Sequence, residues 1–329
     1  MESLKTKKVF RITIILCLLI LTYYAHYITF RIERIKLSEF FIQNFSHRLY
    51  LDIYNDSRYI SKTNVSCNLD IYNDNRNITK TNVLSYSLFG NNWERYGKNV
   101  EHVAKEAANN SLYKKWTIRV YHDKYSISLD NVMNLTERYQ NLEFVNVSNL
   151  IDLESINGMV WRFLIVADLT VDIACIRDLD SKILERESDA VRIWLKSGKL
   201  VYAMKDHPQH DIPILGGMWC YRNKLNRELG IKIAQLCIEN SMHRNPIKQE
   251  EAKKGDDQNI LTRHIWPLIR QNLFIHDSYL CHTDKISESF PTKRDVSGEF
   301  VGQVRGTPGI FKKCPIACRP KKHQDWEYC

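Results

Sequence analysis

The chain has no stretch in which basic residues gather into a stripe. Its 47 Lys and Arg exceed its 38 Asp and Glu, for a net charge of +9, but they are scattered along 329 residues. Nucleic-acid-binding proteins normally concentrate such charge on one face. We therefore expect no nucleic-acid partner, whereas a basic chain suits phosphorylated small molecules. With 44% apolar residues, the chain can fill a sizeable core.

Charged residues are absent from residues 12–30, which contain no Asp, Glu, Lys or Arg. A mostly apolar run of this length is typical of a transmembrane helix. Basic residues flank both ends, and their slight excess before the run favours a cytoplasmic N-terminus. A cleaved signal peptide is the alternative, but Tyr23-Tyr24-Ala25 is a poor cleavage site. We predict a cytoplasmic tail (1–11), an uncleaved signal anchor (12–30) and a type II membrane protein of the Golgi or ER.

Acceptor sequences for N-glycosylation are absent after Asn146 but frequent before it, as expected for a lumenal chain with a glycosylated first half. The predicted sites are Asn44, Asn55, Asn64, Asn77, Asn109, Asn134 and Asn146. Of the nine cysteines, Cys17 lies in the apolar run and eight follow it, an even number that allows disulfides in an oxidising compartment. Cys175 and Cys237 lie inside apolar runs and could equally be reduced, buried thiols. The pairing stays open.

A tandem duplication precedes the main body of the chain. Residues 51–65 (LDIYNDSRYISKTNV) recur at 69–83 as LDIYNDNRNITKTNV. Two copies cannot form a solenoid, which needs at least three stacked units. We interpret residues 31–84 as a glycosylated stem and residues 85–329 as one lumenal catalytic domain.

From residue 85 onward, apolar runs of strand length alternate with helical patterns, which indicates an α/β fold with a mostly parallel, Rossmann-like sheet and flanking helices. The expected strands are 84–89, 117–121, 142–147, 172–176, 200–204 and 273–275, and the expected helices are 98–110, 158–169, 186–196, 226–238 and 257–265. Ligands of parallel sheets gather beyond the carboxyl ends of the strands.

An acidic pair follows one of these strands. In DIACIRDLDSK, the apolar run ends at Arg177, and Asp178 and Asp180 follow. In an extended segment both carboxylates share one face while Leu179 packs away. Their repulsion would be relieved by a hard divalent cation that also binds phosphate oxygens. We predict Mn²⁺ or Mg²⁺ at Asp178 and Asp180; a capped or salt-bridged turn is the alternative.

The order of several segments is similar to that of a known family. RFLIVADLTVDIACIRDLDS is followed by WLKSG, MKDHPQHDIPILGGMWCYR, DDQNILTRHIWP, FPTKR and CPIACRPKKHQDWEYC. The set resembles lumenal and bacterial glycosyltransferase-like proteins with the nucleotide-diphospho-sugar transferase (GT-A) fold, over roughly residues 86–329. The resemblance implies a metal-dependent glycosyltransferase with a nucleotide-sugar donor and a glycan, glycoprotein or glycolipid acceptor. Most members of this family are uncharacterised.

The resemblance also implies roles for particular residues. Donor contacts are expected from the first strand-helix unit and the run before the acidic pair, with cations that neutralise the diphosphate. These donor-binding candidates are Gly90, Asn91, Arg162, Asp168, Arg177, Lys293 and Arg294. His276, after an apolar strand, would complete the metal site. Asp257, at a helix start, is one candidate base, and a plain helix cap is its alternative.

The segment MKDHPQHDIPILGGMW is expected to face the acceptor. Its glycines, Gly216 and Gly217, would permit close backbone approach, Trp219 would offer a stacking face, and Asp206 or His207 would be a general base. His207 also counts as an acceptor contact. The prolines and the lack of a CxxC pair disfavour zinc. A proline-ordered connection with a core tryptophan is the alternative.

Two other functions are alternatives to the glycosyltransferase. A haloacid-dehalogenase-type phosphatase also ends a strand in DxD, but here Ser181 stands where Thr or Val belongs, and several strands come earlier. A GT-A-like binding protein without turnover is the other alternative, because Cys220 stands where the family pattern has glycine. The tail spacing C-x₃-C-x₁₀-C predicts a disulfide-tied clasp rather than a zinc site.

Overall fold

The computed structural model describes residues 20–22, 25, 28–29, 81–149, 156–241, 255–281 and 286–329. The predicted tail, most of the anchor and the stem up to residue 80 lie outside this set, together with Asn44, Asn55, Asn64 and Asn77. None of the helices in the described residues is long and apolar enough to cross a bilayer. The first strand begins at Thr81, inside the segment expected to be stem.

Eight strands of the described residues form one sheet in the order β3-β2-β1-β4-β6-β5-β7-β8. All neighbouring pairs are parallel except those of β6, which runs antiparallel to both β4 and β5. The strands are β1 (Thr81–Leu88), β2 (Thr117–His122), β3 (Leu142–Asn146), β4 (Val171–Arg177), β5 (Val201–Lys205), β6 (Met218–Tyr221), β7 (Leu273–Asp277) and β8 (Ser287–Glu288). The predicted α/β class with a mostly parallel sheet is confirmed.

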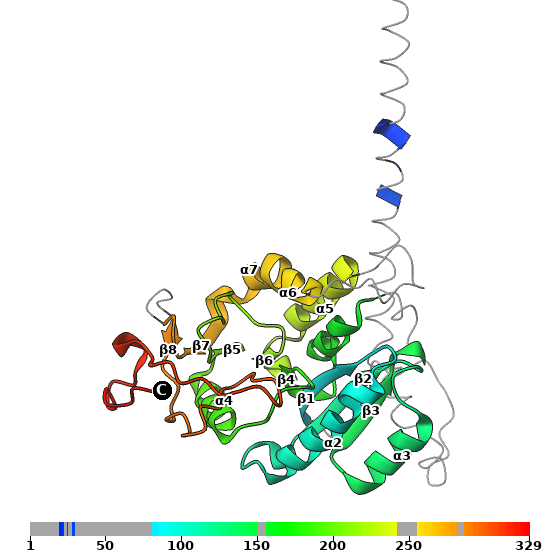
Figure 1. The fold of residues 1–329 in the computed structure, drawn as a ribbon. Coiled ribbons are helices and arrows are strands. Elements are labelled where there is room, and N and C mark those ends of the chain that lie inside the picture. The colour runs from blue at the N-terminus through cyan, green and yellow to red at the C-terminus, as the bar shows by residue number, and fades with distance from the viewer. Residues whose placement is uncertain are drawn as a thin grey trace, which may run out of the picture.

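Helices cover both faces of this sheet, so that the fold has three layers (Figure 1). One face carries α2 (Trp93–Asn109), α3 (Leu129–Arg138) and α4 (Glu185–Ser197); the other carries the 3₁₀ helix η5 (Gly158–Ala167), α5 (Arg227–Ser241), α6 (Asp256–Ile260), the π turn η8 (Leu261–Ile265) and α7 (Trp266–Ile269). Short 3₁₀ turns are η2 (Tyr113–Lys115), η3 (Val147–Asn149), η6 (Asn223–Leu225), η9 (Arg270–Asn272) and η10 (Ile316–Cys318). Helix α3 and strand β6 were not predicted from the sequence.

Strand β4 is central and buried on both faces, which explains its continuous apolar run. Ala174 and Ile176 belong to the core under η5 and α5, whereas Ile173 and Cys175 belong to the core under α2 and α4. The same alternation directs Arg177 toward α4, where it pairs with Glu187.

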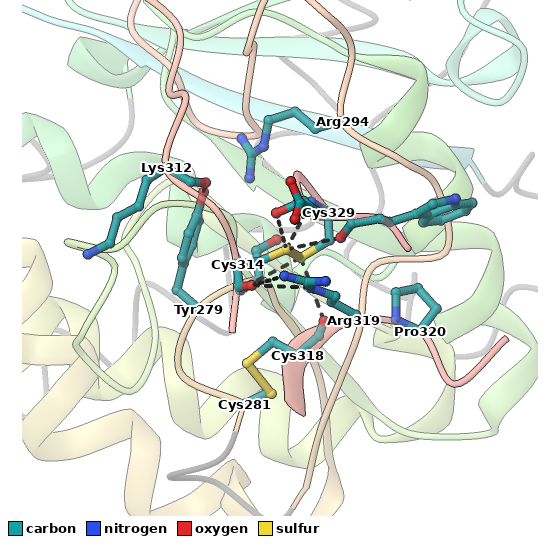
Figure 2. The surroundings of a disulfide bond; sticks show 12 residues. Tyr279, Cys281, Arg294, Lys312, Cys314, Cys318, Arg319, Pro320 and Cys329 are labelled. Atoms are coloured by element: carbon teal, nitrogen blue, oxygen red, sulfur yellow. Dashed lines mark hydrogen bonds between the residues drawn. A yellow bond between two sulfur atoms is a disulfide. The ribbon is translucent and has the colours of Figure 1, made fainter. Parts of the chain in front are cut away.

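Three disulfides join cysteines of the described residues: Cys175–Cys220, Cys281–Cys318 and Cys314–Cys329. Cys175 and Cys220 stand opposite each other on β4 and β6. The reduced-thiol interpretation is therefore wrong for Cys175 but correct for Cys237, a buried free thiol. The bridge also gives Cys220, the departure from the family pattern, a structural role. Figure 2 shows the predicted C-terminal clasp, in which Cys314 bonds to Cys329 and Cys318 to Cys281.

The strand order reverses direction between β1 and β4. The chain runs outward from β1 through β2 to β3, then returns to place β4 on the other side of β1. Such a switch point leaves a crevice beyond the carboxyl ends of the two strands, where α/β proteins bind ligands. Here those ends are Leu88 and Arg177.

Candidate functional site

The acidic pair lies at this switch point, in a turn. The N–H of Ser181 donates to the carbonyl oxygen of Asp178 at 3.1 Å, so the chain turns where the sequence suggested an extended segment. Leu179 packs into the core under α2 and α4, as expected. The turn still leaves both carboxylates partly exposed, and 43% of the Asp178 side chain is accessible.

Arg162 joins two of the predicted site carboxylates. Its buried guanidinium bonds to Asp178 Oδ1 through Nη1 and to Asp257 Oδ2 through Nη2, the latter at 3.0 Å. Strand β1 holds this part of η5 in place, because the Arg162 N–H donates to Ser87 Oγ at 3.0 Å and its carbonyl accepts from Ser85 Oγ at 2.8 Å. Residues that are far apart in sequence thus form one charged unit beyond β1 and β4.

The glycine pair makes this unit possible. A β-carbon at Gly217 would overlap the Asp178 carboxylate, and one at Gly216 would lie 2.7 Å from Asp257 Oδ2. The N–H of Gly216 donates to Gln258 Oε1 at 3.0 Å, which ties the pair to α6. Close backbone approach was predicted here, but the partner is the acidic site itself. Gln258, which the sequence reasoning did not select, directly follows Asp257.

The two carboxylates of the pair differ electrostatically. Burial raises the pKa of Asp178, but Arg162 more than offsets this effect and holds that pKa below its usual range. The pKa of Asp180 is raised, first by burial and then by the negative charge of Asp178. The arginine that favours the ionised form of Asp178 therefore does not fully offset burial and repulsion at Asp180.

The pair fits a divalent cation held jointly with a ligand. Mg²⁺ and similar ions bind through one or two carboxylates plus phosphate oxygens, and a cation would relieve the repulsion at Asp180. No group of three or more His, Cys, Asp or Glu side chains in the described part of the chain is arranged to hold a metal.

The expected third metal ligand lies elsewhere. His276 on β7 is buried, its Nδ1 is 2.6 Å from Tyr202 Oη, and its ring packs against Phe274 and Phe290. Burial lowers its pKa to about 3. His276 is therefore a core residue in this structure, which corrects the sequence-based expectation.

The loop after β1 occupies the place expected for donor contacts. Gly90 has φ = +66°, and its N–H donates to Asp123 Oδ2 at 2.9 Å. Asp123 follows β2 and also accepts from the N–H groups of Tyr125 and Ser126, each at 2.8 Å. Asn91 is exposed beside Gly90. The sequence analysis missed Asp123, although an aspartate directly after an apolar strand marks a candidate site residue.

Asp206 forms a second charged centre and has no exposed surface. Arg186 donates to both of its oxygens at 3.0 Å, and Arg294 Nη2 donates to Oδ1 at 2.7 Å. Ser278 Oγ and the N–H of Val301 complete the set. Asp206 is thus closed off from an acceptor, and Arg294 is buried beside it, so the structure does not support their expected roles. Lys293 is exposed.

Three other expected site residues are also structural. Arg177 pairs with buried Glu187 at 3.0 Å and donates to the Gly217 carbonyl at 3.0 Å. Asp168 precedes β4, at the end opposite Asp178, and there bonds to Arg119. Trp219 on β6 is fully buried, with its ring 5.6 Å from that of Phe163. The alternative of a core tryptophan is therefore correct, and the donor roles of Arg177 and Asp168 are not supported.

The remaining expected residues lie at the surface. His207 is half-buried in the loop after β5. Asn109 and Asn134 are exposed on α2 and α3, and Asn146 is partly exposed at the end of edge strand β3. Their glycosylation stays a prediction.

Comparison with known proteins finds only distant structural similarities. No family model matches the chain, and no curated protein matches it. The glycosyltransferase GlyE of Streptococcus pneumoniae is 14% identical with a TM-score of 0.39, over 60% of this chain and 45% of that one. S. aureus TarS in complex with UDP is 14% identical with a TM-score of 0.34, over 48% and 55%. Mouse xyloside xylosyltransferase 1 is 9% identical with a TM-score of 0.38, over 62% and 90%.

This chain spans less than half the length of GlyE and about half that of the TarS fragment. All three TM-scores lie below 0.5, so these similarities carry no argument about the fold family or the reaction.

Proposed function

We propose that this protein is a glycosyltransferase that moves a sugar from a nucleotide-diphosphate sugar to a glycan, glycoprotein or glycolipid acceptor. One observation carries the proposal: Asp178 and Asp180 are partly exposed at the switch point of a mostly parallel sheet, and Arg162 pairs with only one of them. A nucleoside diphosphate with a divalent cation supplies the charge that this arrangement lacks.

Asp178 and Asp180 would hold Mn²⁺ or Mg²⁺. When bound, such an ion neutralises the negative charge that develops on the departing diphosphate. Arg162 keeps Asp178 ionised and fixes its orientation. The loop at Gly90 and Asn91 is our candidate for the nucleotide contacts, because it lies beyond β1, the neighbour of β4.

Asp257 is our candidate general base. It is the other carboxylate bound by Arg162, and its Oδ1 accepts from the N–H of Gln258 at 2.8 Å. Only 9% of its side chain is exposed. An acceptor hydroxyl would therefore need to displace part of the Arg162 contact to reach Oδ2.

We further propose a type II membrane protein with this domain in the Golgi or ER lumen. The uncharged run at residues 12–30 and the glycosylation sequences support this setting. The three disulfides of the described residues favour an oxidising compartment.

Calorimetry on the purified full-length chain tests the proposal. UDP and GDP are titrated with and without Mn²⁺, and hydrolysis of a panel of UDP- and GDP-sugars is followed. We expect Mn²⁺-dependent nucleotide binding and slow hydrolysis of at least one sugar nucleotide. Replacing both Asp178 and Asp180 by Asn should abolish both, whereas Asp211→Asn, an exposed change, should leave them intact.

Other outcomes identify the competing functions. Release of phosphate from simple phosphate esters would indicate the phosphatase. Absence of nucleotide binding with an intact fold would indicate a binding protein that has the GT-A-like fold without turnover. Nucleotide binding unchanged in the double Asn variant would remove the acidic pair from the mechanism.

A further inference from the structure

The segment after β8 returns across the carboxyl ends of the central strands. Residues 299–305, called here the returning segment, are held at both ends beside the candidate site. The N–H of Val301 donates to Asp206 Oδ2 at 2.9 Å, and the N–H of Arg305 donates to the carbonyl oxygen of Asp180 at 2.8 Å. Between them, Gly302 lies against the side chain of Met218, the residue after Gly217. The returning segment therefore forms a wall of the acidic site.

This wall carries an aromatic group that the sequence analysis did not predict. The ring of Phe300 lies 4.7 Å from that of His207 and 6.0 Å from that of His210, both in the loop after β5. All three residues are partly exposed, unlike the core aromatics of this sheet. We call His207, His210 and Phe300 the aromatic face.

The aromatic face adjoins the acidic pair. The N–H of Asp206 donates to His210 Nδ1 at 3.0 Å, which holds that ring next to the returning segment. The same segment that carries Phe300 touches the acidic site, because the N–H of Arg305 donates to the Asp180 carbonyl oxygen and Gly302 lies against Met218, next to Gly217. A molecule on this face would have its nearest atoms beside the site proposed for the donor.

The chemistry of the face is apolar with neutral hydrogen-bond donors. His207 Nδ1 and His210 Nδ1 each accept from a backbone N–H, that of Gln209 at 3.1 Å and that of Asp206 at 3.0 Å. In this tautomer Nε2 of each ring carries the proton. In that form both rings are uncharged, so the face presents aromatic surface and N–H donors rather than a charge that would attract an anionic group.

We propose that His207, His210 and Phe300 bind the uncharged pyranose ring of the acceptor. This inference rests on the proposed glycosyltransferase function and adds the acceptor's chemical class. A pyranose presents an apolar C–H face to an aromatic ring and hydroxyls to N–H donors, and ligand sites combine such apolar surface with a few placed polar groups. The aromatic face replaces buried Trp219 as the stacking surface.

Saturation-transfer NMR on the full-length chain tests this assignment. With Mg²⁺ and UDP present, the probes are methyl glycosides of glucose, galactose, mannose, xylose, N-acetylglucosamine and N-acetylgalactosamine, plus methyl glucuronide as an anionic probe. At least one uncharged glycoside should bind the wild type. Phe300→Ala and Phe300→Leu should weaken it about tenfold, because both remove the aromatic face. Phe300→Tyr should retain it, and so should Phe311→Ala, a change at an exposed ring elsewhere.

The outcomes separate this inference from the proposed function. UDP affinity, measured on each sample, reports whether the variant is folded and whether the donor site exists. Loss of glycoside binding with UDP affinity kept supports the aromatic face. Wild-type glycoside binding in both Phe300→Ala and Phe300→Leu, no binding of any uncharged glycoside, or preference for the glucuronide would overturn it. Absence of UDP binding in the wild type counts against the proposed function alone, since glycoside binding is scored independently.

Discussion

Two acidic centres of this protein use the same residue types in opposite ways. Asp178 and Asp206 each follow a strand of the same sheet, and each is bonded to a buried arginine. Asp206 has no exposed surface and receives two arginines, a hydroxyl and a backbone N–H. Asp178 is 43% exposed and stands beside Asp180, whose charge has no cationic partner of comparable effect.

This difference shows which of the carboxylates are available to bind a ligand. A saturated, buried ion group gives the fold its geometry, but it has no capacity left for a ligand. A partly exposed acidic pair whose repulsion is only partly offset has that capacity, at some cost in stability, as functional sites often do. The following three changes test this contrast.

Asp206→Asn should have the largest effect on stability. It removes the charge between Arg186 and Arg294 and leaves both buried guanidinium groups without an anion, a loss of about 3–5 kcal/mol in the free energy of unfolding. Urea unfolding of the variant against the wild type measures it. Exposed Asp211→Asn in the same loop is the control. Equal midpoints for the two variants would contradict the structural assignment.

The pH dependence of this loss in stability follows from the direction in which folding shifts the pKa of Asp206. Burial raises the pKa of Asp206, but Arg186 and Arg294 outweigh it and hold the pKa below its usual value. The ionised group therefore contributes stability above the unfolded-state pKa, near 3.9, and that contribution is lost as the pH falls through the lower folded-state pKa. The gap between wild type and Asp206→Asn should narrow in acid.

Gly217→Ala should have a smaller effect on stability but a specific effect on the site. The added methyl group overlaps the Asp178 carboxylate and displaces it, at a cost of about 1–3 kcal/mol. We expect the affinity for UDP with Mn²⁺ to fall about tenfold by calorimetry. Gly198→Ala is the matched control, because its φ of +75° makes alanine unfavourable while no atom lies near the new methyl group. That variant should lose stability and keep UDP affinity. A parallel loss of affinity in both variants would refute a local effect.

Asp180→Asn should have the smallest effect, and it should stabilise. A folded-state pKa raised by burial and by Asp178 means that ionised Asp180 costs stability at neutral pH. Removing it should raise the melting temperature of the metal-free protein by about 1–3 °C. This gain in melting temperature should disappear as the pH falls, because Asp180 takes up a proton in the wild type, and its raised pKa moves that uptake to higher pH.

Saturating Mn²⁺ should make the wild type the more stable of the two proteins, because only the wild type keeps both carboxylates of the proposed metal site. Differential scanning calorimetry with and without Mn²⁺ measures both melting temperatures. If Asp180→Asn melts below the wild type without metal, ionised Asp180 does not destabilise the fold.

Much of this architecture could be predicted from local pattern. Apolar runs of strand length gave the parallel strands, and the acidic pair after a run buried on both faces marked the end of a central strand. β6 escaped prediction because four residues after two glycines look like a loop until two neighbouring strands pair with them. The sequence predicted that the backbone at Gly216 and Gly217 is closely approached, but it did not predict that Asp257 and Asp178 are the groups that approach it.

The sequence by itself determined most of the strands, the position of Asp178 and Asp180 at the carboxyl end of one of them, and the close backbone approach at Gly216 and Gly217. Only the tertiary structure decided which charged residues are already neutralised. Arg162 reaches Asp257 across 95 residues, and Arg294 reaches Asp206 across 88. Whether a carboxylate is saturated or available depends on such long-range pairs, because Coulomb attraction and burial act through space rather than along the chain.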